Sequence, residues 1–419
     1  MFPLLLVALL AAAPLTVEEH ATMPAIASPR LSPDGKRIAY VVTRADLERS
    51  TYESDIWLID ADGRNEMQLT RSPGSDARPR WSPDGKRIAF RSDRNGRNAI
   101  WLIEPNGGEA VRLTSEATGV GVFEWSPDGK SLAFTRVDAP SADEERRVRE
   151  KDDARVIGQN DRHTHLYVID VESRAVRRLT RGAYSVFNFD WSPDSKSVAF
   201  ARGPGLGLDD QYRTDIYLAR ADGEGEPRPL VVRPGIDYWP SFSPDGKSLA
   251  FFSSGGVHDW LVEHQVHVVD LEGGTPRLVS RAYDRTPDDV TWSDDGRTLW
   301  LSGPWNTTNQ LFRIGSDGNG FTNVSNVSGM VTDAHIAAGR VTFILQSLAN
   351  PPELHVSELA QWSPRQLTHI NDAYRGRAAD TRVIRWKNPK DGLEIEGLLT
   401  LPPGYKPGTR VPLLTWAHG

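Results

Sequence analysis

The chain has 419 residues, a formal net charge of −7 and no cysteine. Because acidic and basic residues are interspersed and the net charge is negative, we expect no basic surface for nucleic acid and exclude that partner. The lack of cysteine excludes disulfides and thiol chemistry and leaves the compartment open.

The first segment, 1–15, is apolar and partly matches a secretory signal peptide. Small residues at Ala11 to Ala13 suit a cleavage site, but no lysine or arginine precedes Arg30, and Pro14 would hinder cleavage. We expect export to the periplasm or the medium, with a cytoplasmic location as the alternative. The segment is too short for a stable membrane span, so none is expected.

A short helix is predicted over residues 16–26. Thr16 and Glu19 have the spacing of a capping box, in which each residue satisfies a backbone N–H near the other. The helix is expected to lead into the repeats that follow.

One phrase then recurs six times, as LSPDGKRIAY, WSPDGKRIAF, WSPDGKSLAF, WSPDSKSVAF, FSPDGKSLAF and WSDDGRTLW. The serines of successive copies are 50, 44, 66, 51 and 50 residues apart, at Ser32, Ser82, Ser126, Ser192, Ser243 and Ser293. A period of this length is typical of propellers and solenoids.

Each phrase predicts a tight turn between two strands. Proline presets φ, aspartate bonds nearby backbone, and glycine accepts the positive φ that closes the turn. After the turn, Ile88 and Phe90 point to one face and Ala89 to the other, as in a strand packed between two sheets. Two more strands follow in each unit, for example DIWLID and MQLT, so each unit has four antiparallel strands.

These units predict an all-β fold, a seven-bladed β-propeller over residues 27–369. The seventh unit is degenerate and covers 334–368. The first blade begins with its own inner strand near Ala27, and the last ends with its own outer strand near Thr368. We therefore expect side-chain packing, rather than a shared strand, to close the ring. The blade tryptophans are expected in the core between blades.

The long spacing of 66 residues marks an insertion in the third blade, at 138–162. Its charged residues predict a helix with ion pairs between Asp143 and Arg147 and between Glu145 and Arg149. A solvated excursion is the favoured interpretation, and covering of a substrate opening is the alternative.

The period stops before the last segment, 370–419, which contains RVIRWKNPKDGLEIEGLLTLPPGYKPGTRVPLLTWAHG. Together with the SPDGK repeats, this segment resembles the prolyl oligopeptidase family of serine peptidases, in its acylaminoacyl-peptidase and dipeptidyl-peptidase-like branches. The resemblance implies that 370–419 comprises a linker and the opening strands of an α/β-hydrolase domain that is cut short. It also implies that His418 and Gly419 begin the His-Gly-Gly-Pro sequence of the oxyanion loop.

The resemblance implies an intact enzyme that hydrolyses short peptides through an acyl-enzyme. The sequence contains no Gly-x-Ser-x-Gly, and the family's triad lies beyond the strand that ends at His418. We therefore expect this chain alone to be inactive, with short peptides as substrates of the intact enzyme. The alternative is a non-enzymatic, TolB-like propeller that binds a partner. The sequence does not indicate an oligomeric state.

Other polar groups are assigned no site. The pair His163 and His165 and the cluster His258, His264 and His267 lack the cysteine or carboxylate pattern of a metal site, so no metal or cofactor is expected. In one branch of the family paired glutamates read a free amino terminus. The sequence around Glu144 and Glu145 does not match that motif, so the role is not transferred.

Overall fold

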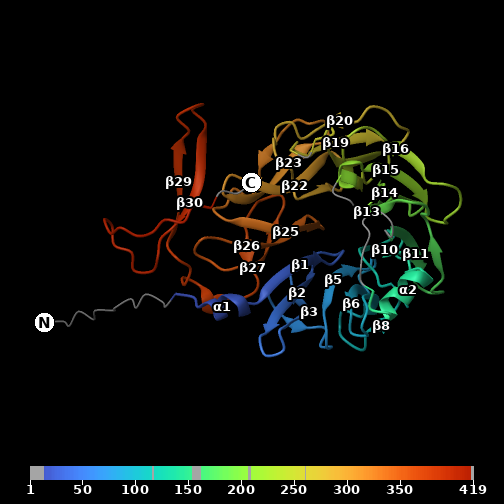
Figure 1. Ribbon diagram of the computed structural model, residues 1–419, viewed down its shortest axis with the longest axis horizontal. Helices are drawn as coiled ribbons and strands as arrows, with labels where there is room; N and C mark the ends of the chain where they lie inside the picture. Colours follow the sequence, from blue (N-terminus) through green and yellow to red (C-terminus); the bar gives the residue numbers. More distant parts are fainter. Residues whose placement is uncertain (1–13, 116–117, 153–161, 206–208, 260, 417–419) are drawn as a thin grey trace.

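The computed structural model describes residues 14–115, 118–152, 162–205, 209–259 and 261–416. Twenty-eight strands form seven four-stranded antiparallel blades arranged in a ring (Figure 1), and one parallel pairing of β23 with β25 joins blades 6 and 7 into a single sheet. The first strands of neighbouring blades contact each other, so they form the inner wall. The predicted all-β, seven-bladed propeller is confirmed.

The blades follow the chain order from the inner to the outer strand. Blade 1 contains β1 (Ala25–Leu31), β2 (Arg37–Asp46), β3 (Thr51–Asp60) and β4 (Met67–Gln68). Blade 2 contains β5 (Asp76–Trp81), β6 (Ile88–Ser92), β7 (Ala99–Ile103) and β8 (Val111–Arg112). Blade 3 contains β9 (Phe123–Trp125), β10 (Ser131–Val137), β11 (Thr164–Asp170) and β12 (Val176–Arg178).

The remaining blades have the same order. Blade 4 contains β13 (Ser185–Trp191), β14 (Ser197–Gly203), β15 (Asp215–Arg220) and β16 (Arg228–Val231). Blade 5 contains β17 (Asp237–Phe242), β18 (Ser248–Ser253), β19 (Gln265–Asp270) and β20 (Arg277–Leu278). Blade 6 contains β21 (Asp289–Trp292), β22 (Thr298–Trp305), β23 (Thr308–Gly315) and β24 (Thr322–Asn323). Blade 7 contains β25 (Met330–Ala337), β26 (Arg340–Gln346), β27 (Glu353–Glu358) and β28 (Arg365–Gln366).

The hydrophobic core lies between the blades rather than within any one of them. Ile88 and Phe90 pack in the cluster between blades 1 and 2, whereas Ala89 packs in the cluster between blades 2 and 3. The large and small residues of the repeated phrase therefore face opposite neighbours, as the alternation predicts.

The repeated turn is held by the same hydrogen bonds in every copy. In blade 2, Ser82 Oγ donates to Asp84 Oδ1 at 2.6 Å, and that oxygen accepts the Lys86 N–H at 3.0 Å. Ser82 Oγ in turn accepts the Arg87 N–H at 2.9 Å. Ser-to-Asp bonds of the same kind occur in the other five copies. Serine and aspartate thus fix the turn locally, which explains why the phrase recurs.

Blade 4 departs from the phrase, because Ser195 stands where the other turns have glycine. Ser195 has φ 61°, a left-handed conformation that is unfavourable for serine. Its Oγ accepts the backbone N–H of Asp128, in the turn of blade 3, at 3.1 Å. The unfavourable conformation of Ser195 is thus accompanied by a hydrogen bond that links blades 3 and 4.

The blade tryptophans lie between blades, as predicted, and also make a hydrogen bond that the sequence did not indicate. The indole of Trp125 donates to the carbonyl of Arg80, in the inner strand of the preceding blade, at 3.1 Å. The same bond is made by Trp81 to Arg30, Trp191 to Glu124 and Trp292 to Ser241.

Blades 1, 5 and 7 lack this tryptophan, and blades 1 and 5 use a side chain of the preceding blade instead. The backbone N–H of Phe242 donates to Asp190 Oδ2 at 2.7 Å, and that of Leu31 donates to His335 Nδ1 at 3.2 Å. Asp190 and His335 occupy equivalent places in blades 4 and 7. A polar link therefore joins these blades even where no indole is present.

The ring closes between blades 7 and 1 without an exchanged strand, as predicted. A shared cluster joins Ile26 and Tyr40 of blade 1 to Ile344 and Leu354 of blade 7. Hydrogen bonds support this seam, from the Ser28 N–H to Asp333 Oδ2 at 2.9 Å and from Arg340 Nη1 to the Gly35 carbonyl at 3.0 Å. Side-chain packing and these bonds hold the ends of the ring together.

Two helices flank the ring. The predicted capping box is present in α1 (Val17–Thr22), which ends earlier than expected because the residue before Pro24 is disfavoured in helical conformation. In the insertion, α2 (Ala142–Arg149) has no buried residue. Asp143 pairs with Arg146, and Arg147 Nε pairs with Asp152 Oδ2 at 3.1 Å, so the predicted pairing of Asp143 with Arg147 is wrong. The short 3-10 turns η1 (Asp209–Tyr212) and η2 (Asp372–Tyr374) complete the helical elements of the described chain.

After the ring, β29 (Thr381–Lys387) and β30 (Glu394–Thr400) form a hairpin that projects from it (Figure 1). Glu396 Oε1 accepts bonds from the N–H and Oγ1 of Thr307 in blade 6, at 3.1 and 2.6 Å. Arg377, before the hairpin, pairs with Glu19 of α1 at 2.6 Å. Among the described helices, none combines the length and apolarity needed to cross a membrane.

Candidate functional site

The predicted oxyanion-loop residues, His418 and Gly419, lie outside the described residues, as does most of the predicted signal segment. The polar groups of the propeller itself therefore define the candidate site.

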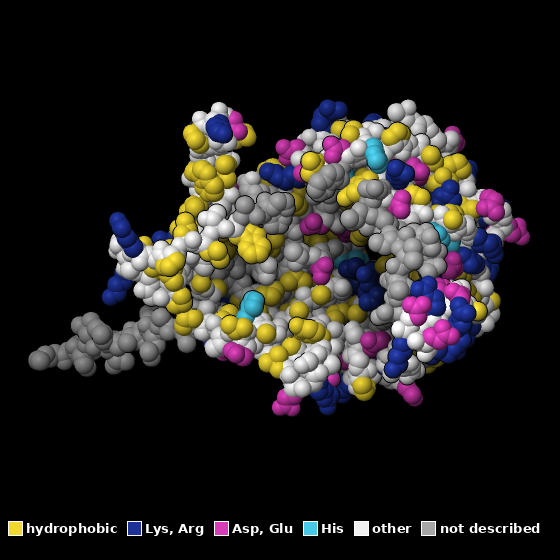
Figure 2. Space-filling model, viewed as in Figure 1, with side chains coloured by type: hydrophobic (Ala, Val, Ile, Leu, Met, Phe, Trp, Pro, Cys, Tyr) yellow, Lys and Arg dark blue, Asp and Glu magenta, His cyan; other side chains and the backbone are white. Residues whose placement is uncertain are grey.

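The middle of the ring is hollow, and side chains of Arg or Lys, His, and Asp or Glu are visible within it (Figure 2). One source is the inner-strand position just before the repeat residue that is Leu31, Trp81, Trp125, Trp191, Phe242, Trp292 or Ile336. This position is polar in every blade: Arg30, Arg80, Glu124, Asp190, Ser241, Thr291 and His335. Aligning the repeats would have revealed this pattern, but the sequence did not indicate which groups meet.

These groups interact across the ring. Arg30 in blade 1 has electrostatic contacts with Arg80, Glu124, Asp289 and Asp333, which come from blades 2, 3, 6 and 7. Burial, followed by the charge of Arg80, lowers the pKa of Arg30 to about 10. Arg80 Nε forms an ion pair with Glu124 Oε1 at 2.5 Å. The inner strands thus bring charges that are far apart in sequence to one opening.

Burial controls the ionisation of the other groups in the opening. It raises the pKa of Asp190 to about 7, although the N–H groups of Phe242 and Trp191 oppose the shift. It also raises the pKa of Asp289 to about 6. Burial, with Arg30 and Arg80, lowers the pKa of His335 well below its usual value, so a neutral imidazole accepts the Leu31 N–H.

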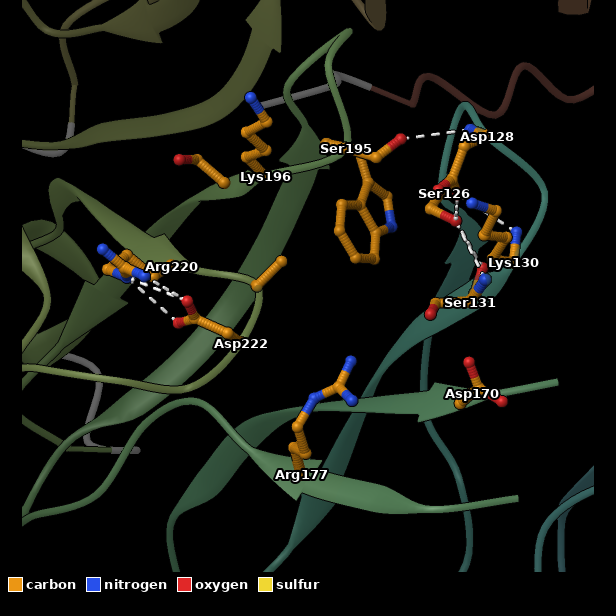
Figure 3. A pocket seen from close by; sticks show the side chains of 13 residues that line it. Ser126, Asp128, Lys130, Ser131, Asp170, Arg177, Ser195, Lys196, Arg220 and Asp222 are labelled. Atoms are coloured by element: carbon orange, nitrogen blue, oxygen red, sulfur yellow. Dashed lines mark hydrogen bonds and ion pairs between the residues drawn. The ribbon is translucent and has the colours of Figure 1, made fainter. Parts of the chain in front are cut away.

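A second candidate is the groove between blades 3 and 4, a cavity of about 480 Å³ (Figure 3). It is lined by the turns at Asp128 and Ser195 and by the charged side chains of Arg177, Arg220 and Asp222. Arg220 and Asp222 pair with each other (Figure 3). Similar grooves lie between blades 2 and 3 and between blades 5 and 6. Because the groove recurs with the turn, it is a product of the repeat rather than a dedicated site.

Four of the five histidines singled out in the sequence, His163, His165, His264 and His267, have structural partners. His165 is buried, with Nδ1 3.1 Å from Thr180 Oγ1 and Nε2 3.3 Å from Asp138 Oδ2. His264 Nδ1 lies 3.1 Å from the Tyr238 hydroxyl. No group of three or more potential metal ligands occurs in the part of the chain that the structure describes.

The first residue of the glutamate pair, Glu144, is also accounted for by local structure. Glu144 Oε2 accepts the Ser141 N–H at 2.7 Å, and Ser141 Oγ accepts the Glu144 N–H at 3.2 Å. This capping box begins α2 and occupies the carboxylate.

Comparisons with known proteins agree with this fold. Residues 17–161 match the family model described as PD40, TolB beta propeller domain. A dipeptidyl-peptidase 5 of Trichophyton schoenleinii is 29% identical over 141 residues, which are 31% of this chain and 19% of that protein. The match therefore spans about a fifth of the length of this curated relative.

Solved structures show the same architecture. An acylaminoacyl peptidase of Pyrococcus horikoshii aligns with a TM-score of 0.72 and 20% identity over 94% of this chain and 60% of its own. The propeller domain of the Trilobed protease from Pyrococcus furiosus, described as having an open velcro topology, aligns with a TM-score of 0.61 and 18% identity over 84% of this chain and 99% of its own. At these identities the likeness establishes the fold. The repeats, the unshared ring closure and these comparisons together show a seven-bladed propeller that is similar to the propellers of these peptidases.

Proposed function

We propose that the chain is the substrate-gating propeller of a serine peptidase that hydrolyses short peptides through an acyl-enzyme. The observation that carries the proposal is the extent of the structural match to the acylaminoacyl peptidase. The ring runs from Ala25 to Gln366, so a match over 94% of the chain includes segments outside the ring. A propeller that only binds a partner does not require the added hairpin, whereas in a peptidase the hydrolase domain would continue from it.

In this proposal the ring acts as a filter. Seven blades surround its central opening, and they are held together by side-chain packing, including that between blades 7 and 1, and by the indole hydrogen bonds. A folded protein is too large to enter, whereas a short or unfolded peptide presents one strand to the polar wall. The chemistry would belong to a triad beyond the hairpin, with His418 and Gly419 beginning the loop that stabilises the oxyanion.

The test is the reading frame of the source gene beyond the codon for Gly419. We expect the frame to continue with Gly-Pro and, further along, with Gly-x-Ser-x-Gly. The 419-residue chain, assayed with acylaminoacyl and dipeptidyl fluorogenic peptides, should release no product. Turnover by this chain, or a frame without a nucleophile elbow, would contradict the proposal.

A second candidate is a non-enzymatic binding propeller, favoured by the PD40 match over residues 17–161. It predicts that the ring alone captures one partner at a defined stoichiometry, and that the frame ends near Gly419. In both cases we propose export, which fractionation of a tagged protein and sequencing of its mature N-terminus would test.

A further inference from the structure

The wall of the opening formed by blades 1 and 2 carries an excess of arginine. Arg78 of β5 has electrostatic contacts with Arg80 and with Arg91 of β6, and Arg80 in turn contacts Arg30. Glu124 is the carboxylate on this wall, and it forms its ion pair with Arg80. Four guanidinium groups are therefore gathered around one paired carboxylate.

Two of these arginines have no partner in the described chain. The side chains of Arg78 and Arg91 make no hydrogen bond or ion pair with a described residue. The carboxylate whose charge acts on Arg78 is Glu124, which is already paired with Arg80. Burial, followed by the charges of Arg91 and Arg80, lowers the pKa of Arg78. A partly buried cation next to like charges is unfavourable unless an anion balances it.

The backbone places Arg78 at the opening. The register of β5 against β6 shifts between Ala77 and Arg80, and Arg78 has φ 55°. Pro79 follows it and has no N–H for the strand ladder, which favours a bulge here. The equivalent bulge residues Ser28, Trp239 and Asp333 also have positive φ.

The other bulge residues show where this position points. Asp333 contacts Arg30 electrostatically and accepts the Ser28 N–H, and Trp239 bonds to the carboxylate of Asp289. All of these contacts lie within the ring of inner strands. A side chain at the bulge position of β5 therefore belongs to the same opening.

The wall formed by blades 5 to 7, which meets blade 1 at the seam, has a different character. Blades 5 to 7 contribute Asp289, Asp333 and the half-exposed ring of Trp239. The opening is thus cationic at blades 1 and 2 and acidic and aromatic at blades 5 to 7. This polarity suits a short zwitterionic peptide, with its carboxylate toward the arginines.

We propose that Arg78 and Arg91 form a subsite for the free carboxylate of a short peptide inside the propeller opening. The planar guanidinium fork matches a carboxylate in a bidentate arrangement, and two adjacent forks would satisfy both oxygens. This inference rests on the proposed function and adds a preference for peptides that carry a free carboxylate.

The experiment measures binding to the full 419-residue chain by titration calorimetry at low salt. The probes are acetyl-trialanine with a free carboxylate, the same peptide as its C-terminal amide, and acetyl-Ala-Glu-Ala amide. We expect the free acid to bind at least about tenfold more tightly than the amide. Tight binding of the glutamyl amide would show that a side-chain carboxylate also fits, and weak binding would restrict the subsite to the terminal carboxylate.

Substitutions locate the binding. Arg78→Gln is expected to lower the affinity for the acid about tenfold, to the level of the amide, and Arg78→Lys to restore part of it. Arg64→Gln is the control of equal charge change, because Arg64 is exposed and pairs with Asp62 outside the opening. The melting temperature of each variant checks folding. Equal binding of acid and amide, or equal losses in Arg78→Gln and Arg64→Gln, would overturn the inference.

The outcome is independent of catalysis. If carboxylate binding fails while the reading frame encodes Gly-x-Ser-x-Gly, the subsite is wrong and the proposed function stands. If binding succeeds while the frame lacks that motif, the ring is a carboxylate-binding module without a peptidase domain.

Discussion

The indole bond between blades predicts that Trp125 stabilises the ring by more than its apolar surface. Replacing it in Trp125→Phe keeps an aromatic ring and removes the donor to the Arg80 carbonyl, 3.1 Å away. The loss of one buried hydrogen bond and the desolvated carbonyl left behind should cost about 1–3 kcal/mol in the free energy of unfolding. The packing lost with the smaller ring adds to this.

Trp101 provides a matched control, because both tryptophans are 9% exposed. The indole nitrogen of Trp101 is buried and has no partner in the described chain. Trp101→Phe therefore loses similar packing and also removes an unsatisfied donor, so it should cost at least about 1 kcal/mol less than Trp125→Phe. Urea unfolding followed by far-ultraviolet circular dichroism compares the two variants. Equal destabilisation, or a larger effect of Trp101→Phe, would refute the role of the indole bond.

Three further predictions concern single contacts. The free energy of unfolding in urea should be about 1 kcal/mol lower for Ser195→Ala than for Ser195→Gly, because both lose the bond from Asp128 but only glycine removes the left-handed strain. Equal stabilities of the two variants would contradict this prediction. Burial raises the pKa of Asp190 to about 7, so the folded state binds more protons than the unfolded state between about pH 4 and 7, and the free energy of unfolding should fall as pH rises through that window. Asp190→Asn should flatten this part of the curve of unfolding free energy against pH, and an unchanged slope would contradict the prediction. Thr307→Val should increase tryptic cleavage within β29 while the ring stays resistant, because the contacts with Glu396 tie the hairpin to blade 6. An unchanged cleavage rate would show that these contacts do not hold the hairpin.

The fold was predictable because its information is local. Each SPDGK turn is fixed by hydrogen bonds within six residues, such as those of Ser82 with Asp84 and Arg87. Every copy of the phrase therefore predicts the pair of strands on either side of it. The unshared closure was predictable as well, since complete first and last blades leave no strand to exchange.

The candidate site was not predictable, because it depends on contacts between blades. The charges of Arg30 and Asp333 are about as far apart in sequence as the ring allows, and ring closure makes them neighbours. The bulges that direct Arg78 and Trp239 inward had a signal in the sequence, since a proline follows each within the inner strand. The helix pairing was missed for another reason: Asp143 has two arginines in reach on α2, and spacing alone does not choose between them.

Labelling of the native protein tests most directly whether the ring belongs to a serine peptidase. The polypeptide that carries this ring would be captured from the source organism with an antibody against the propeller, treated with a fluorophosphonate and analysed by mass spectrometry. We expect one labelled serine within Gly-x-Ser-x-Gly on the same polypeptide as the ring. A native polypeptide that ends near Gly419 and takes no label would contradict it.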